Sequence, residues 1–187
     1  VRAGFRINLA GSNVAYGFKP DLICFGKAIA NGYPLSALVG SNDLKDAAEK
    51  VYFTGTQFFS APPMAAAKAT LLELKKSDAA NKITDFGERL NKALIKTAED
   101  CGFKLIASGI PAMPYYRIEG VDKETHFSWI DHCVKNGVYM TAWHNHFIST
   151  AHTNEDLVAI QESAKKAFTA LSKSTEVKVE SRYKIKS

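Results

Sequence analysis

The stretch Asp21-Leu22-Ile23-Cys24-Phe25-Gly26-Lys27-Ala28 decides how the rest of this chain is interpreted. Its apolar run, residues 22–25, has the length of a short strand. A continuous apolar run is typical of a strand buried on both faces, as in a parallel sheet. A lysine at the end of such a strand, flanked by Gly26 and Ala28, is poorly explained as a solvating charge. We therefore interpret Lys27 as an amine that reaches into a closed site.

The pattern on either side of Lys27 predicts an α/β segment. A second apolar run closes at Gly40, and the paired prolines that precede Met64 suit the first turn of a helix, where a missing N–H costs nothing. The predicted elements are a loop over 1–20, strands over 22–25, 35–39 and 51–53, a helix over 42–50, and a helix that begins at Pro62 or Pro63 and continues to Lys75.

The second half of the chain has a different pattern of apolar residues. Apolar residues at helical spacing, with Gly102 after them, predict a long helix over about 80–100. Thr153 and Asp156 have the spacing of a capping box, which predicts a helix to about Leu171. The other predicted elements are strands over 103–106, 112–118 and 138–141, a helix over 123–135, and a late strand or tail over 176–185.

These elements predict three parts of an α/β chain. Residues 1–76 form an α/β segment, 77–102 a connecting helix, and 103–187 a small α+β domain.

The 187 residues are 46% hydrophobic and 23% charged, which is ordinary globular composition. The net charge of +5 is interleaved with acids, so we expect no nucleic-acid partner. Three scattered cysteines predict free thiols and a cytoplasmic location, and no apolar run is long enough to predict a membrane span.

Several stretches together resemble one known family. The block from Lys19 to Gly40 is the most specific, and four more stretches agree with it in the same order: Val1–Arg6, Thr54-Gly55-Thr56, Ala65–Leu71 and Phe147–Asp156. They are similar to the class III, fold-type I, pyridoxal-phosphate-dependent aminotransferases. Among these, the sequence pattern is most similar to that of glutamate-1-semialdehyde 2,1-aminomutase and its aminotransferase relatives.

The resemblance implies a fold and a chemistry. The fold is part of the large cofactor-binding domain, with a mostly parallel sheet, followed by the small C-terminal domain. Lys27 forms a Schiff base with pyridoxal 5′-phosphate and shuttles a proton at the substrate. Gly55 and Thr56 bind the cofactor phosphate of the neighbouring subunit, which implies a homodimer. The substrates are a small amino acid and a keto acid or aldehyde, and the same lysine serves transferase and mutase chemistry alike.

The chemistry of lysine agrees with this implication. A Schiff base needs an amine, and an amine is nucleophilic only when it is neutral for part of the time, which requires desolvation. We expect the strand end and the small residues beside Lys27 to supply this desolvation. Cys24, next to the site in sequence, is predicted to be a buried small hydrophobe.

Two departures from the family pattern limit what is transferred. Phe58-Phe59-Ser60-Ala61 stands where relatives often have Ser-Gly-Asn-Pro, so no specific substrate is predicted. The acidic partner of the cofactor's pyridine nitrogen and the phosphate loop would lie upstream of Val1. The chain therefore resembles the C-terminal half of the enzyme, and we expect it to be catalytically incompetent alone. The alternative function is a fragment that acts only as a dimerising or binding module.

Other residues have competing interpretations. His144 and His146, with His152 nearby, suit a zinc site, but no acid or thiol stands at matching spacing. We therefore favour a loop at the substrate entrance for His144 and His146, and a local hydrogen bond for His152. Arg117 either pairs in a salt bridge, the default, or contacts a substrate carboxylate. Two further assignments concern the tryptophans: Trp129 is expected in the core, and Trp143 at the surface or the edge of a site.

Overall fold

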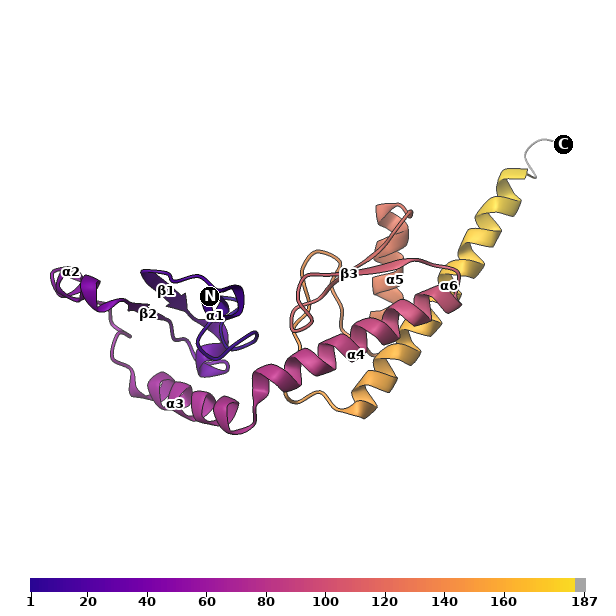
Figure 1. The fold of residues 1–187 in the computed structure, drawn as a ribbon. Helices are drawn as coiled ribbons and strands as arrows, with labels where there is room; N and C mark the ends of the chain where they lie inside the picture. The colour runs from indigo at the N-terminus through magenta and orange to yellow at the C-terminus, as the bar shows by residue number, and fades with distance from the viewer. Residues whose placement is uncertain (184–187) are drawn as a thin grey trace. The chain divides into compact units, whose positions relative to one another are not determined.

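The structure, a computed structural model, describes the backbone of residues 1–183 and the side chains of residues 1–173. The chain divides into two compact units, the first covering residues 1–82 and the second beginning at Ile83. The division falls within helix α4 (Ala79–Asp100), inside the predicted connecting helix (Figure 1). Each unit is described by itself.

The first unit is built on a two-stranded hairpin. Strands β1 (Leu22–Phe25) and β2 (Ala37–Gly40) pair in antiparallel register, with Leu22 opposite Gly40 and Phe25 opposite Ala37. Both predicted strands are present, but the expected parallel pairing is wrong for the described residues. Eleven residues separate the two strands. A parallel pair requires a crossover of about a dozen residues or more, so this connection returns the chain antiparallel.

The predicted burial of β1 on both faces is also wrong. Ile23 and Phe25 are half-buried on one face, whereas Leu22 and Cys24 are exposed on the other. The prediction that Cys24 is a buried hydrophobe therefore fails. The physical reason is that, within the described residues, the core of this unit packs against one face of the hairpin alone.

That core is small. Phe5, Ile29, Ala30 and Ala67 are its buried members, and the ring of Phe25 packs 5.0 Å from the ring of Phe5. Ile29 and Ala30 come from the short 3₁₀ helix η1 (Lys27–Ala30), which packs on helix α3 (Ala61–Lys76). The core therefore joins the turn that follows β1 to helix α3, which is separated from β2 by twenty residues.

The remaining elements of the first unit are short. Helix α1 (Ser12–Tyr16) lies within the predicted loop, and η2 (Asn42–Leu44) with α2 (Lys45–Glu49) fulfils the helix prediction for 42–50. The prolines stand in the first turn of α3, as predicted. The predicted strand over 51–53 is wrong: these residues are exposed and have no partner strand in the described structure.

The second unit packs around one face of α4. The buried stripe is spaced three or four residues apart, as an amphipathic helix requires: Ile83, Phe86, Leu90, Leu94 and Ala98. Gly87 lies on the same face, where an added Cβ would overlap the carbonyl of Pro111. A glycine is therefore needed in mid-helix for the chain at Pro111 to approach the backbone of α4.

Two strands and two helices complete this unit (Figure 1). Strands β3 (Leu105–Ser108) and β4 (Tyr115–Ile118) are antiparallel, and helices α5 (Lys123–Lys135) and α6 (Asn154–Tyr183) pack together. Trp129, predicted in the core, is fully buried, and its ring stacks 5.1 Å from that of Phe168. The structure confirms the 123–135 helix.

Helix α6 begins with the predicted capping box. The N–H of Thr153 donates to the Asp156 carboxylate at 2.8 Å, and the N–H of Asp156 donates to Thr153 Oγ1 at 3.3 Å. The helix continues to Tyr183, so the expected end near Leu171 and a strand over 176–183 are both wrong; residues 184–185 lie outside the described structure. The strand predicted over 138–141 is absent as well. No helix in the described residues has the length and apolarity to cross a membrane.

Candidate functional site

Lys27 stands at an abrupt change of backbone direction. Gly26 is fully extended, and Lys27 then adopts a φ of 52°, in the left-handed region that side chains other than glycine rarely occupy. The N–H of Ile29 donates to the carbonyl of Gly26 at 3.3 Å and closes the turn. Such a conformation costs about 1–3 kcal/mol and persists where its surroundings fix it, which is a common property of functional sites.

Packed neighbours hold this turn on both sides. Ile29 and Ala30 after it are buried in the core of the first unit, and the half-buried Phe25 before it packs against that core. The side chain of Lys27 itself is exposed, so the expected desolvation at the strand end is not provided by the described residues. The fold therefore fixes the backbone of Lys27 and leaves its amine accessible.

Gly55 and Thr56 lie in the loop that leads into α3. The N–H of Phe58 donates to the carbonyl of Gly55 at 3.0 Å, and an added Cβ at Gly55 would meet no atom within 4 Å. Both residues are exposed, as are most of the aromatic residues around them. The loop thus presents backbone and a hydroxyl group to the outside, with open space for a ligand.

The two predicted cofactor positions are linked through α3. Helix η1, which opens with Lys27, packs on α3, and the loop of Gly55 and Thr56 is the segment that precedes α3. No hydrogen bond or ion pair joins Lys27 to either loop residue within the described structure. The structure therefore holds these residues in one unit without bringing their side chains into contact.

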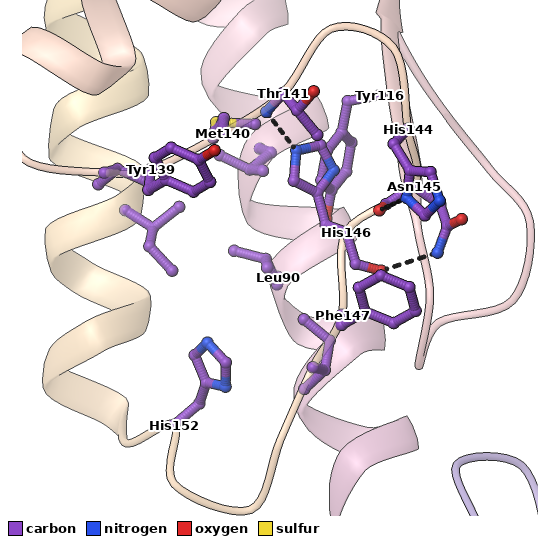
Figure 2. A pocket seen from close by; sticks show the side chains of 14 residues that line it. Leu90, Tyr116, Tyr139, Met140, Thr141, His144, Asn145, His146, Phe147 and His152 are labelled. Carbon is purple, nitrogen blue, oxygen red and sulfur yellow. Dashed lines mark hydrogen bonds between the residues drawn. The ribbon is translucent and has the colours of Figure 1, made fainter. Parts of the chain in front are cut away.

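The second unit contains a half-open pocket of its own (Figure 2). Its volume is about 450 Å³, and its lining is mostly apolar and comes from Leu90 of α4, Tyr116 of β4 and residues between Val138 and Ile148. Two of the histidines considered for zinc, His144 and His146, belong to that segment.

His146 joins two parts of the pocket wall. The N–H of Thr141 donates to its Nε2 at 3.2 Å, and its Nδ1 donates to the carbonyl of Pro114 at 3.3 Å. This pair of bonds requires the neutral ring with the proton on Nδ1. Burial, and more weakly the neighbouring His144, lower the pKa of His146, which favours the same form. His146 is thus a structural residue of the 138–148 segment.

The metal interpretation receives no support in the part of the chain that the structure describes, where no group of ligands could hold an ion. The N–H of Ser149 donates to Nδ1 of His152 at 3.1 Å, so the predicted local hydrogen bond at the start of α6 is confirmed.

Trp143 is 70% exposed, in agreement with a surface position. The default salt bridge of Arg117 is wrong: this exposed guanidinium has no acidic partner among the described side chains.

Sequence reasoning missed His126, on α5. It is 7% exposed, and neither ring nitrogen has a hydrogen-bond partner in the described residues. The signal was present, because His126 stands three, four and seven residues before the buried Trp129, Ile130 and Cys133. That spacing places it on the buried face of the helix.

Comparison with known proteins identifies relatives of both units. The family described as aminotransferase class-III matches residues 10–174. The chain is 39% identical over 172 residues to an aminopentol aminotransferase of Sphingopyxis macrogoltabida, covering 91% of this chain and 41% of the relative. It is 30% identical over 178 residues to a 3-aminobutyryl-CoA aminotransferase of Cloacimonas acidaminovorans, covering 92% of this chain and 43% of the relative.

A solved structure agrees with these relatives. FumI of Sphingopyxis sp. MTA144, in its PLP internal aldimine form, superposes with a TM-score of 0.89 at 37% identity, covering 94% of this chain and 43% of FumI. The chain therefore spans less than half the length of the relatives that it matches. Because the family match covers most of its residues, the chain belongs to the class III aminotransferases.

Proposed function

We propose that this chain is part of a pyridoxal-phosphate-dependent aminotransferase in which Lys27 carries the cofactor. The observation that supports this most directly is the Lys27 turn, where an exposed amine sits on a backbone fixed in the left-handed region. When bound, pyridoxal phosphate supplies an aldehyde for the amine and an electron sink for the substrate. Lys27 would hold the cofactor through Nζ and move a proton at the carbon that bears the amino group.

The donor set fits such a cofactor. The side-chain nitrogen of Lys27 forms no ion pair among the described residues, so no acidic side chain competes with the cofactor for it. Gly55 leaves open space where a phosphate could approach the backbone, and Thr56 adds an exposed hydroxyl group. Backbone N–H and hydroxyl groups are the donors from which phosphate oxygens accept hydrogen bonds. The absence of contact between Lys27 and this loop agrees with a loop that serves the cofactor of a second subunit, as in a homodimer.

The proposed substrates are small amino compounds with a keto acid or an aldehyde as partner. The names of the two relatives describe amines that are not α-amino acids, an aminopentol and a 3-aminobutyryl thioester. An amine remote from a carboxylate is therefore our preferred donor class. Both relatives are named aminotransferases, so they add no support for mutase chemistry.

We further propose the three-part organisation suggested by the pattern: residues 1–76 as the end of the large domain, 77–102 as the connecting helix, and 103–187 as the small domain. The first unit exposes large apolar side chains, among them Leu38 at 65% and Tyr52 at 91%. In the complete enzyme these would be covered, so the 187 residues alone are expected to lack turnover. A dimerising or binding module is the second candidate function, and the same exposed side chains favour it.

Reductive trapping tests the role of Lys27. The full chain is mixed with pyridoxal phosphate and reduced with borohydride, and the added mass is located by peptide mapping. We expect the tag on Lys27. The Lys27→Ala variant should lose it, and the matched variant Lys19→Ala, which removes an exposed lysine of the same segment, should keep it.

Two further measurements separate the candidate functions. Lys27→Ala in the complete gene product should lower transamination by about 100-fold or more, the range of a missing acid–base group. Even tagging of many lysines in that protein, or activity unchanged by Lys27→Ala, would exclude the proposed role. A selective tag without turnover in the 187-residue chain would mean that the site lysine is correctly placed and that the remaining groups are supplied from outside it.

A further inference from the structure

A second, smaller pocket lies on the second unit, apart from the one around His146. It has a volume of about 250 Å³ and is bordered by strand β4, the first turn of α5 and the segment at Ala142 and Trp143. Arg117, Lys123 and His126 all line it. Nothing in the proposed chemistry of Lys27 uses these side chains.

Two cations of this pocket lack acidic partners. Arg117 is exposed and has no ion pair among the described side chains, and the same is true of Lys123. The Lys123 ammonium instead lies 4.4 Å from the ring centroid of Trp143 and 5.2 Å from that of Phe127. These two rings pack edge to face at 4.5 Å. The pocket therefore combines two unpaired positive charges with an aromatic wall.

His126 is the polar group that sets this pocket apart from a basic surface. It is 7% exposed, yet both ring nitrogens are without a partner in the described structure. Buried polar groups are almost always hydrogen-bonded, so an unpartnered ring in a pocket wall needs an explanation. Burial, and then the charge of Arg117, lower the pKa of His126, so the neutral ring offers one donor and one acceptor.

The nearby acids are engaged elsewhere. Asp122, which also lines the pocket, caps α5 by accepting the N–H of Thr125 at 2.7 Å. Glu119 pairs with Lys104. Among the described side chains no ion pair is formed by Arg117 or Lys123, so both cations are available to an external anion.

We propose that this pocket binds a small carboxylate with an apolar body, its charged end at Arg117 and Lys123 and its body against Trp143. The guanidinium fork matches a carboxylate in a bidentate geometry, and the ring of His126 can complete the hydrogen bonds. The aromatic wall contributes apolar contact that an inorganic anion could not use. The volume suits a ligand smaller than those of drug-sized pockets, which occupy about 300–1,000 Å³.

Tryptophan fluorescence of the full chain gives a direct test. The chain has two tryptophans, and Trp129 is fully buried while Trp143 is 70% exposed in the pocket wall. Titration with benzoate should change the emission of Trp143 in a saturable way, and Trp143→Phe should abolish the change. Benzamide, of the same shape without the charge, and inorganic phosphate, charged without an apolar body, should both bind more weakly.

The variants separate binding from folding. Arg117→Gln should weaken benzoate binding by about tenfold or more, because it removes a charged hydrogen-bond donor. Lys123→Gln should also weaken it. Arg89→Gln, an exposed arginine of the same unit outside the pocket, should leave it unchanged. Equal affinities for benzoate and benzamide, a phosphate affinity equal to that for benzoate, or binding unaffected by both pocket variants would overturn the proposal.

The source of the natural carboxylate is a separate question, which kinetics of the complete enzyme answers. If Arg117→Gln raises the KM for a keto acid and leaves kcat unchanged, the carboxylate belongs to the substrate. If KM is unchanged while benzoate binding is lost, the pocket takes a separate carboxylate ligand. The binding test needs neither cofactor nor turnover, so its failure is distinguishable from failure of the Lys27 proposal.

Discussion

The two units of this chain differ in how completely each buries its own apolar residues. In the second unit Trp129, Phe168 and Leu94 are fully buried. In the first unit the core cluster of the described residues has four buried members, and side chains as large as Tyr52 and Phe59 are more than 80% exposed. The residues proposed for cofactor chemistry all lie in the first unit, whereas the second has the core expected of an independently stable fold. The residues proposed for chemistry and the larger buried core therefore lie in different parts of the chain.

The strongest test of this difference is to remove an aromatic core side chain from each unit. Trp129→Ala should destabilise the second unit by about 3–5 kcal/mol, because a large buried ring leaves a cavity. Phe5→Ala in the smaller core of the first unit should cost less. Amide hydrogen exchange, measured separately for each unit, reports both effects. Equal losses of protection in the two units would contradict the comparison.

A second pair of substitutions compares glycines. Gly87→Ala should cost about 1–3 kcal/mol or more, because its Cβ would overlap the carbonyl of Pro111. Gly55→Ala meets no atom within 4 Å and should stay within about 0.5 kcal/mol. Urea denaturation followed by circular dichroism measures both. A neutral Gly87→Ala would show that the chain at Pro111 can move away from α4 at no cost.

Loss of a helix cap should have a smaller effect. Thr153→Ala removes the hydroxyl that accepts the N–H of Asp156 and should destabilise the second unit by about 1 kcal/mol. Thr153→Ser keeps the hydroxyl and is the matched control. Thermal denaturation of the three proteins checks this prediction, and a Thr153→Ser variant as unstable as Thr153→Ala would assign the loss to something other than the cap.

The smallest expected effect is a pH dependence confined to the second unit. Burial lowers the pKa of His146, so the unfolded chain binds more protons and stability rises with pH. The contribution of neutral His146 to the free energy of unfolding is fully present above the ordinary histidine pKa of 6.5. It is lost as the pH falls through the lowered pKa of the folded protein. Protonation of Nε2 would also remove its bond from Thr141.

Melting temperatures between pH 8 and pH 5 test this dependence. The wild type should lose stability towards low pH, and His146→Gln should lose less of it. His126, whose pKa is also lowered by burial, should contribute in the same direction, so His126→Leu combined with His146→Gln should flatten the profile further. A profile unaltered by both substitutions would exclude the two rings as its source.

The sequence predicted some parts of this structure well because their causes are local. The capping box at Thr153, the prolines of α3 and the periodicity of 123–135 each act within a few residues, and all three predictions are correct. The family was identified from the residues around Lys27 for a different reason: chemistry restricts which residue types can stand there.

The failures have non-local causes. The run from Leu22 to Phe25 was expected to be buried on both faces, but burial depends on what lies above a strand, and the described residues cover one face of it. Val138–Thr141 has the composition of a strand and no partner strand within the described structure. The pocket at Arg117 and His126 joins β4 to α5, so no single stretch of sequence shows it. The roles of Lys27, Gly55 and Thr56 stay predictions.

The left-handed backbone of Lys27 lowers the stability of the protein, whereas the side chain of Lys27 is required for the proposed activity. Glycine adopts a φ of 52° without steric cost, so Lys27→Gly would relieve the strain of this turn and remove the amine at the same time. A selection for thermal tolerance alone would therefore favour loss of the side chain on which the proposed chemistry depends. If Lys27 has the proposed role, activity is the reason for a lysine here, and a stabilising library should hold this position fixed.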